Sequence, residues 1–357
     1  MRVSVFRPKP LHIILALISN ALLLLLGFFR ETGKCSIVPP KVLAVKQSGT
    51  PPEEYDFRPA STLFSQNDID AMSTEQYEYP RMREWIGPGA EHVELFHALL
   101  SSSRAGLYVD VGANEGVLMT LAAMMGNPAI GVEAIAQNYV KLLNIIEKRG
   151  YQKNMKVVHA AASDRSGSLV AFKENFNVEL KQRNGQQLTP NQQVSPETVI
   201  QYTTTVTLDS ILDSSVLLLK LDCEGTEFLA LNGAKNLFSS RKVKYVHFEF
   251  SPGNMASISG QGSPNRMLHF MISNGYRVYV EDCSHDVSAE VIKMLPCRCA
   301  KQTDAGYAEK FRDLDFSNLA DYELSQDTVD DFVSVLLEAS QDGSMLVNIL
   351  SVRDDDK

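Results

Sequence analysis

Two acid-rich segments contain the side chains of this sequence that are best suited to chemistry. The first, Asp110–Gly116, reads DVGANEG, and the second, Lys220–Glu227, reads KLDCEGTE. Carboxylates repel phosphate groups, and this repulsion increases where water is excluded. They attract cations, and they can accept a proton from a reacting hydroxyl group. The two segments therefore predict a site for a positively charged ligand, with carboxylates available as general bases.

The elements around the first segment form a recognisable unit. Leu107–Val111 is a short apolar run of the kind that forms a buried strand. After the glycine-containing turn, Val117–Met125 has the pattern of a helix, which Gly126 ends. A second strand, Ala129–Val132, is followed by the acid Glu133. A strand, a glycine turn, a helix, a strand and an acid in this order are typical of a nucleotide-binding α/β unit.

The spacing and charge of the turn indicate which nucleotide is bound. Dinucleotide-binding folds use a G-x-G-x-x-G turn, because the pyrophosphate lies close to the backbone and the helix N-terminus. Here three residues separate Gly112 from Gly116, and the carboxylates of Asp110 and Glu115 would repel a pyrophosphate. S-adenosylmethionine (SAM) carries an ammonium and a sulfonium group and no phosphate. The segment therefore predicts a SAM site, with an NAD-linked oxidoreductase on the same fold as the alternative.

Both segments resemble motifs of a known family. Asp110–Gly116 is similar to the first motif, D-V-G-A-N-x-G, of the FkbM-type methyltransferases, and Lys220–Glu227 is similar to their K-I/L-D-x-E-G-x-E block. The segments occur in the family's order, and the resemblance extends from Val93 to Val352 but does not reach the first 80 residues. It implies a SAM-dependent methyltransferase with a Rossmann-like class I fold.

The nucleoside part of the cofactor has two candidate partners. Glu133, at the end of the second strand, can accept hydrogen bonds from both ribose hydroxyls, although an exposed strand-end charge would have the same sequence. Asp164 follows the third predicted strand, where a polar side chain can accept a bond from the adenine amino group. Turn chemistry alone would also explain Asp164.

The methionine part is expected to face the first motif. Asp110 or the backbone of Gly112 would contact it, whereas Asn114 and Glu115 could instead cap the following helix. The predicted cofactor-binding residues are Asp110, Gly112, Asn114, Gly116, Glu133 and Asp164.

The second segment supplies the catalytic candidates. Lys220, Asp222 and Glu224 alternate along the chain, so all three can point the same way from a strand. Methyl transfer is an in-line displacement that needs alignment, and a hydroxyl acceptor also needs a general base. The predicted catalytic residues are Asp222, Glu224 and His247, with Asp222 favoured and Glu249 as a further contributor. A carboxylate pair could instead hold a divalent metal, but no metal ligands are assigned.

Alternating strands and helices predict a doubly wound, mostly parallel, seven-stranded sheet with an antiparallel last strand. Residues 175–200 are rich in Gln and Asn and predict a loop or lid that selects the substrate, and residues 281–324 have no assignable pattern. The further strands are expected at Val157–Ala162, Val216–Leu221, Val243–Phe250, Tyr276–Val280 and Met345–Val352. The other helices are expected at Glu91–Leu100, Ala136–Arg149, Glu227–Phe238, Arg266–Ser273 and Asp327–Ala339.

The N-terminal segment predicts a membrane anchor. Leu11–Phe29 contains no formally charged residue, and as a helix it would be about 28 Å long, close to the thickness of a bilayer core. Positive residues precede it, which favours a cytoplasmic N-terminus. A cleaved signal peptide is the alternative, although no A-x-A-like cleavage site follows. The predicted parts are a cytoplasmic tail (1–10), a transmembrane signal anchor (11–29), a stalk (30–80) and a methyltransferase domain (81–357).

Topology and composition indicate the location and the partners. A single-pass type II membrane protein would place the domain in the lumen of the Golgi or another endomembrane, where Cys283 could pair with Cys297 or Cys299. The net charge of −9 argues against a nucleic-acid partner. The prediction is an O-methyltransferase for a hydroxyl-bearing sugar, glycan or small molecule. A non-catalytic, membrane-tethered binding module is a further alternative.

Overall fold

The computed structural model describes residues 93–103, 105–177, 182–187, 200–283, 287–299, 316–339 and 345–354. The predicted tail, membrane span and stalk lie outside these residues, so the three boundaries between the four predicted parts stay predictions. Within the described ranges, no helix is both long enough and apolar enough to span a membrane.

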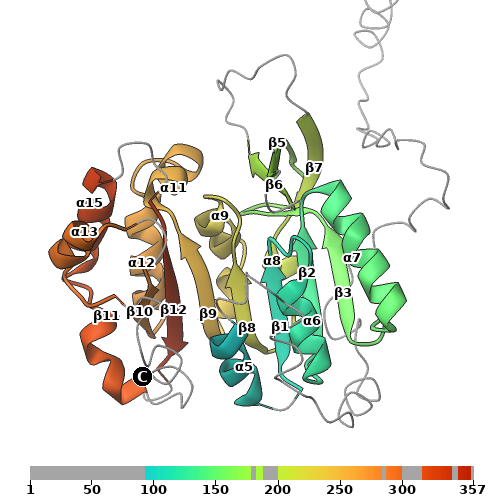
Figure 1. Cartoon of the computed structure of the whole chain (residues 1–357), viewed down its shortest axis with the longest axis horizontal. Coiled ribbons are helices and arrows are strands. Elements are labelled where there is room, and N and C mark those ends of the chain that lie inside the picture. Colours follow the sequence, from blue (N-terminus) through green and yellow to red (C-terminus); the bar gives the residue numbers. More distant parts are fainter. Residues whose placement is uncertain are drawn as a thin grey trace, which may run out of the picture. The chain divides into compact units, whose positions relative to one another are not determined.

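A mostly parallel central sheet organises the described residues (Figure 1). Its order is β11-β10-β12-β9-β8-β1-β2-β3. Strands β3, β2, β1, β8 and β9 pair in parallel, and β12 is antiparallel to both of its neighbours, β9 and β10. The bounds are β1 Leu107–Val111, β2 Ala129–Glu133, β3 Met155–His159, β8 Val216–Leu221, β9 Val243–Phe250, β10 Tyr276–Asp282, β11 Glu323–Leu324 and β12 Val347–Arg353.

This arrangement confirms the predicted mostly parallel sheet and its antiparallel last strand. The described part of the sheet has eight strands rather than the predicted seven. The additional strand, β11, is only two residues long and comes from the segment that had no assignable pattern. Two residues are too few to show an alternating pattern in the sequence, so this edge strand could not be predicted.

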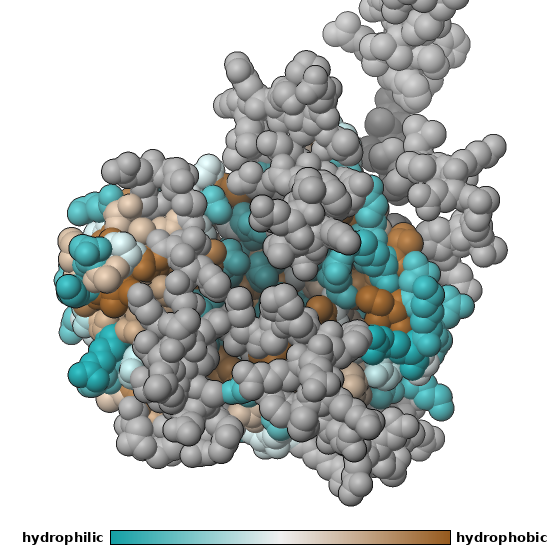
Figure 2. Space-filling model, viewed as in Figure 1, coloured by the Kyte–Doolittle hydropathy of each residue, from teal (hydrophilic) through white to brown (hydrophobic). Residues whose placement is uncertain are grey.

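Helices cover both faces of the central sheet. One face packs against α5 Val93–Ser101, α6 Val117–Met124, α7 Ala136–Arg149 and the 3-10 helix η1 Phe316–Tyr322. The other packs against α8 Leu208–Ile211, α9 Glu227–Asn232, α10 Lys235–Ser239, α11 Pro252–Ser259, α12 Ser263–Ser273, α13 Ala289–Met294 and α15 Val329–Ala339. The outer face of α7 is mostly hydrophilic, with a small hydrophobic patch where Val140 and Leu143 are exposed (Figure 2).

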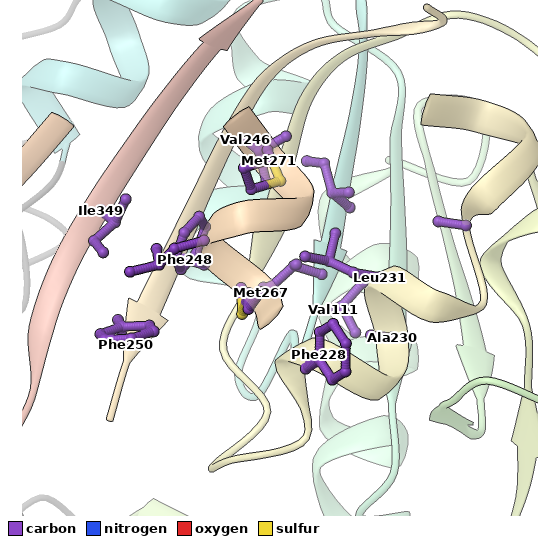
Figure 3. Packing of buried hydrophobic residues seen from close by; sticks show 14 of the residues in the cluster. Val111, Phe228, Ala230, Leu231, Val246, Phe248, Phe250, Met267, Met271 and Ile349 are labelled. Carbon is purple, nitrogen blue, oxygen red and sulfur yellow. The ribbon is translucent and has the colours of Figure 1, made fainter. Parts of the chain in front are cut away.

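The core forms because successive strand residues point to opposite faces. In β9, Val246 and Phe248 face α12, where they pack with Met267 and Met271 and with Ile349 of β12 (Figure 3). All five side chains are fully buried, and burial of each such side chain stabilises the fold by about 1.5–3 kcal/mol. This packing fixes the strands whose ends form the site described below.

A second, smaller sheet corrects two predictions. It contains β4 Ala161–Ala162, β5 Leu169–Asn177, β6 Gln182–Gln187 and β7 Ile200–Val206, in the order β4-β7-β5-β6. The predicted loop at 175–200 therefore includes the end of β5 and all of β6, while residues 188–199 lie outside the described residues. The predicted strand Val157–Ala162 divides at Ala160, because β4 leaves the central sheet and pairs with β7.

The polarity of β6 explains the missed hairpin. An antiparallel ladder is held by backbone hydrogen bonds, so an edge strand needs no apolar face to pair. Gln201 of β7 connects this sheet to the central one. Its side-chain amide donates to the carbonyl oxygen of Ala134 at 2.9 Å and accepts from the amide of Ala136 at 3.2 Å. Figure 1 shows the second sheet beyond the ends of the central strands.

Two further differences concern connections between elements. The predicted helix Glu227–Phe238 is two helices, α9 and α10, that meet at Gly233, where a Cβ would lie 2.1 Å from the carbonyl oxygen of Ser163. Of the two possible disulfides, the structure contains Cys283–Cys299, and Cys297 is a free thiol.

Candidate functional site

A cavity of about 260 Å³ opens at the carboxyl ends of β1, β2, β8 and β9. Open α/β sheets bind their ligands at this edge, where the winding of the chain reverses. Residues from the turn after β1, from β5 of the second sheet and from the connection between β3 and β4 complete its lining. Hydrophilic atoms form the floor of a hollow near the centre of the face in Figure 2.

The turn after β1 is shaped by two glycines with left-handed backbone conformations. Gly112 has a φ of 79°, and a Cβ there would lie 1.8 Å from the carbonyl oxygen of Asp222. Gly116 has a φ of 73°, and a Cβ there would lie 2.1 Å from the side chain of Leu142. Glycine thus lets the ends of β1 and β8 approach each other. Of the two, Gly112 lines the cavity.

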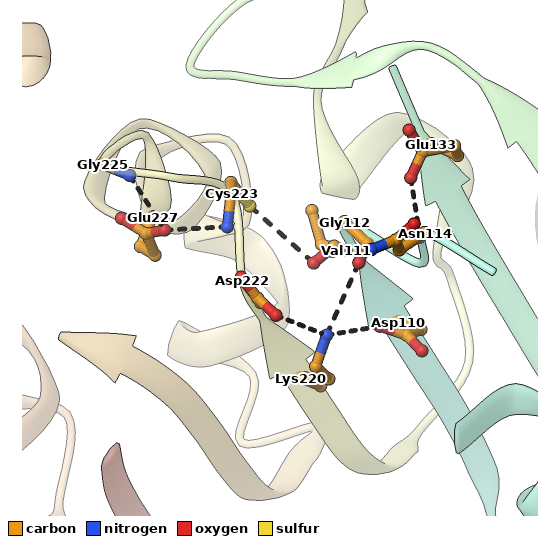
Figure 4. A network of polar contacts seen from close by, with 10 residues as sticks. All are labelled: Asp110, Val111, Gly112, Asn114, Glu133, Lys220, Asp222, Cys223, Gly225 and Glu227. Atoms are coloured by element: carbon orange, nitrogen blue, oxygen red, sulfur yellow. Dashed lines mark hydrogen bonds and ion pairs between the residues drawn. The ribbon is translucent and has the colours of Figure 1, made fainter. Parts of the chain in front are cut away.

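Glu133 lies where β2 meets the cavity. Its carboxylate accepts a hydrogen bond from the backbone amide of Asn114 at 2.8 Å (Figure 4). It accepts a second one from the backbone amide of Ile135, also at 2.8 Å. Burial raises the pKa of Glu133 to about 7, although both backbone donors lower it. A carboxylate has about four acceptor positions, so Glu133 can still accept bonds from two hydroxyl groups. Asn114 contributes its backbone to this arrangement.

Asp110 lies behind the cavity. It is 1% exposed, and the Nζ of Lys220 lies 3.2 Å from its Oδ1 and 3.1 Å from the Oδ2 of Asp222 (Figure 4). Burial raises the pKa of Asp110, while Lys220 lowers it. Burial lowers the pKa of Lys220, but the charges of Asp110 and Asp222 raise it by more than burial lowers it. The net pKa shift is upward, so the amine is charged. Lys220 thus connects the ends of β1 and β8.

The role of Lys220 was missed from the sequence, although a signal was present. Lysine is rarely buried without a partner, and Lys220 interrupts the otherwise apolar strand VLLLKL. The register of β1 and β8 places it directly opposite Asp110. A buried lysine opposite a buried aspartate predicts an ion pair, but only once the strand pairing is known.

Glu227 holds the turn after β8. One of its carboxylate oxygens accepts from the amides of Cys223 at 2.8 Å and Gly225 at 3.1 Å (Figure 4). The side chain is 1% exposed, and burial raises its pKa to about 7. Within this turn Glu224 has a φ of 55°, a left-handed conformation that is unusual for a residue other than glycine.

Three carboxylates line the β8–β9 end of the cavity: Asp222, Glu224 and Glu249. Asp222 is paired with Lys220. In the part of the chain that the structure describes, neither Glu224 nor Glu249 has an ion-pair partner. Burial and then repulsion by Asp222 raise the pKa of Glu224 to about 7. Burial, followed by repulsion from Asp222 and Glu224, raises the pKa of Glu249.

His247 lies elsewhere, which corrects its expected position. Strand β9 continues to Phe250, so His247 is inside the sheet rather than at its edge. It is 2% exposed, its Nε2 lies 3.2 Å from the Oε2 of Glu281, and its ring contacts the edge of Phe96 with centroids 5.0 Å apart. The structure therefore does not bring His247 to the cavity beside Asp222 and Glu224.

Asp164 is also outside the lining of the cavity. It lies in the turn after β4, with the Nε of Arg165 3.4 Å away, and its expected contact with adenine stays a prediction. The adjacent end of the cavity is apolar instead, because Ile135, Ala161 and Phe172 pack together there. Phe172 was missed because it belongs to the second sheet.

The lining fits a cationic nucleoside better than a dinucleotide. Its apolar end can take a base, and the buried Glu133 can bind ribose hydroxyls. The other end carries carboxylates, and the amine beside it, Lys220, is already shared between Asp110 and Asp222. A pyrophosphate would meet this negative charge. Among the described residues, no group of three or more His, Cys, Asp and Glu side chains could hold a metal ion.

Comparisons with known proteins agree with this site. Residues 110–278 match the family model of the methyltransferase FkbM domain, and the chain matches no curated protein. The FkbM methyltransferase from Methylobacillus flagellatus KT is a similar solved structure, 15% identical, with a TM-score of 0.33 and coverage of 49% of this chain and 39% of that chain. This chain thus spans less than half of that protein's length.

Two other solved structures are similar at the same low level. Precorrin-6y C5,15-methyltransferase from Geobacter metallireducens GS-15 is 13% identical, with a TM-score of 0.29 and coverage of 52% of this chain and 71% of that chain. The plantazolicin methyltransferase BamL, in complex with a triazolic desmethylPZN analogue and S-adenosylhomocysteine (SAH), is 10% identical, with a TM-score of 0.34 and coverage of 76% of this chain and 88% of that chain. Such similarities carry no argument about substrate. The part of the chain that matches the methyltransferase FkbM domain, residues 110–278, includes both acid-rich segments, and this match supports SAM as the cofactor.

Proposed function

We propose that the domain transfers the methyl group of SAM to a hydroxyl oxygen of a sugar, glycan or small-molecule acceptor. When bound, SAM supplies an electrophilic methyl group on a positively charged sulfur. The observation that carries the proposal is the presence of Glu224 and Glu249 at one end of the cavity, where neither has an ion-pair partner among the described residues. A hydroxyl acceptor needs a general base, and a group with a pKa near 7 is well suited to that task.

The rest of the cavity supports the binding half of this proposal. Glu133 would accept the ribose hydroxyls, and the apolar surface of Ile135, Ala161 and Phe172 would hold the adenine. The backbone at Gly112 would face the methionine part. Asp110 would not contact the cofactor, because it is paired with Lys220 and does not line the cavity.

The ion pairs favour Glu224 over Asp222 as the base. Asp222 is 3.1 Å from the amine of Lys220, and a nearby positive charge reduces the tendency of a carboxylate to take up a proton. Asp222 would then orient the acceptor, while Glu224 receives its proton. Methyl transfer depends strongly on such alignment, because the displacement is in line.

Two measurements test this function. Calorimetry with SAH should give saturable binding to the purified full-length chain. Labelled SAM should then transfer its methyl group to an acceptor in a glycan or small-molecule fraction, and the product should be a methyl ether. Glu224→Gln should keep SAH binding and lose transfer. A methylated nitrogen or carbon in the product would contradict O-methylation, and a chain that binds SAH but transfers no methyl group would be a binding module.

We further propose that the domain lies in the lumen of an endomembrane, anchored by Leu11–Phe29. The apolar character of that segment and the Cys283–Cys299 disulfide support this location, because disulfides persist in oxidising compartments. A C-terminal tag should be protected from protease in intact microsomes and become sensitive when detergent is added. An N-terminal tag that remains on the mature chain would favour the anchor over a cleaved signal peptide.

A further inference from the structure

Two carboxyl groups that have no ion-pair partner in the described part of the chain line the same end of the cavity. Glu224 follows β8 in a left-handed turn, and Glu249 lies at the end of the neighbouring strand, β9. Lys220, whose positive charge lowers the pKa of both glutamates, is already paired with Asp110 and Asp222. The two glutamates therefore add negative charge to a site that already contains a carboxylate.

Two carboxylates in one poorly hydrated site cannot both ionise without cost, so such a pair tends to hold a proton. The titration of the two groups is then a property of the pair rather than of either residue. The direction of both pKa shifts agrees with this view, because burial and repulsion by Asp222 raise the pKa of both residues, and Glu224 further raises the pKa of Glu249. Glu227 adds to the repulsion of Glu249, and Lys220 lowers the pKa of both residues.

The order of the strands indicates which part of the cofactor faces this pair, an inference that rests on the proposed function. The apolar end of the cavity adjoins β3 and β4, Glu133 ends β2, and the pair lies beyond β1 at β8 and β9. In a nucleoside, the base and the 5′ substituent are attached to opposite ends of the ribose. A cofactor with its adenine at the apolar end and its ribose at Glu133 therefore directs its sulfur towards β8 and β9.

We propose that Glu224 and Glu249 form one proton-sharing pair whose protonation follows the charge on the sulfur of the bound cofactor. The pair loses its proton when the positively charged cofactor binds, because the sulfonium favours the ionised carboxylates. It regains a proton when that charge disappears, and the proton comes from the acceptor hydroxyl. Glu249 is then a catalytic residue that neither sequence motif contains.

The balance of the transfer step is simple. A carbon–oxygen bond forms between the methyl group and the acceptor, and the carbon–sulfur bond breaks with its electron pair remaining on sulfur. The hydroxyl proton passes to an oxygen of the Glu224–Glu249 pair. One positive charge is lost at sulfur while one negative charge is neutralised on the pair, so the net charge of the site does not change.

The test compares SAM with SAH, which differ in the charge on sulfur. Calorimetric titrations of the full-length chain at pH 7, in buffers of different ionisation enthalpy, give the number of protons released by each ligand. SAM should release about 0.5–1 proton more than SAH, because only the sulfonium displaces the shared proton. Contributions of Glu133 are common to the two ligands and cancel in the difference.

Three variants separate the pair from its surroundings. Glu249→Gln should reduce the difference, because the sulfonium then ionises one carboxyl group instead of two. Glu224→Gln should reduce it as well, because Glu249 is then no longer repelled by Glu224. Glu338→Gln changes an exposed carboxyl on α15 and should leave the difference intact.

The outcomes distinguish this proposal from the proposed function. Equal proton release by SAM and SAH in the unmodified chain would overturn the pair while leaving methyl transfer untouched, and this comparison needs no variant to fold. A difference that is unchanged in either Gln variant would also overturn it. Absence of saturable binding by either ligand would overturn the proposed function, and the pair with it.

Discussion

The carboxylate of Glu133 connects three parts of the site through its oxygens. It accepts hydrogen bonds from the backbone amides of Asn114 and Ile135, and it lines the cavity. We expect Glu133→Gln to weaken SAH binding, because an amide group cannot accept from all the same donors as a carboxylate. A hydrogen bond to a charged group contributes about 1.5–3 kcal/mol, so the Kd measured by calorimetry should rise roughly 10- to 150-fold.

The same substitution has a consequence for pH dependence. Because the pKa of Glu133 is raised to about 7, the ionised form that accepts hydroxyl donors becomes depleted below that pH. The affinity for SAH should therefore increase as pH rises from 6 to 8, and this trend should flatten in Glu133→Gln. Glu338→Gln, on an exposed helix face, serves as the control and should behave like the unmodified chain. An unchanged Kd in Glu133→Gln would remove Glu133 from the cofactor site.

At the scale of elements, the close approach of β1 and β8 depends on Gly112. We expect Gly112→Ala to be strongly destabilising, because a Cβ would lie 1.8 Å from the carbonyl oxygen of Asp222. Gly150→Ala is a matched control, since Gly150 has a similar φ of 72° with nothing within 4 Å of its Cβ position. That control should lose only about 1–2 kcal/mol from the left-handed conformation itself.

Thermal unfolding of the two alanine variants measures this difference. The midpoint should fall much further for Gly112→Ala than for Gly150→Ala, and SAH binding should be lost only in the first. Equal midpoints would mean that the turns after β1 and β8 can separate without cost. The close packing of the two motif segments would then not be required for the fold.

The second sheet contributes Phe172 to the cavity, and this contribution can be measured separately. Phe172→Ala should weaken binding of SAH and of adenosine by a similar factor, because both contain adenine. Truncation of a buried Phe costs about 3–5 kcal/mol of stability where the site cannot collapse. Because Phe172 lines an open cavity, the binding free energy lost in Phe172→Ala should be smaller than this. Calorimetry with both ligands decides the matter. A loss confined to SAH would place Phe172 near the methionine part instead.

The sequence predicted the elements that follow strong patterns and missed those that do not. The apolar run before Gly112 predicted β1, and the helical pattern after Gly116 predicted α6. The hairpin of β5 and β6 has polar side chains on its edge strand, so its pairing comes from the backbone and from contacts far along the chain. No local pattern could reveal it.

The site residues divide in the same way, into those that a local sequence pattern reveals and those that depend on contacts far along the chain. Glu133 and Glu224 could be found because Glu133 ends β2 and Glu224 lies in the turn after β8, at the edge where ligands bind. His247 lies on a strand that continues beyond it, and a histidine three residues before a strand end cannot be placed without knowing that end. Phe172 reaches the cavity only through the second sheet. Lys220 needed the register of β1 with β8.

At the scale of the whole molecule, the buried carboxyls make stability depend on pH. Burial raises the pKa of Glu133, Glu224 and Glu227 to about 7, from an ordinary value of 4.5. The folded chain thus binds these protons more tightly than the unfolded chain. Their contribution to the unfolding free energy is complete below pH 4.5 and is lost as pH rises through about 7. The half-buried His97 and His159 oppose this trend, because partial burial lowers their pKa.

A comparison of one variant with the unmodified chain separates these opposing effects. Glu227 is 1% exposed and does not line the cavity. Glu227→Gln keeps an oxygen for the amides of Cys223 and Gly225 and removes the ionisable group. In urea unfolding, the unmodified chain should lose on the order of 1–2 kcal/mol more than this variant between pH 5.5 and pH 8. Parallel pH profiles would show that Glu227 titrates normally, so that its burial in the turn after β8 carries no electrostatic cost.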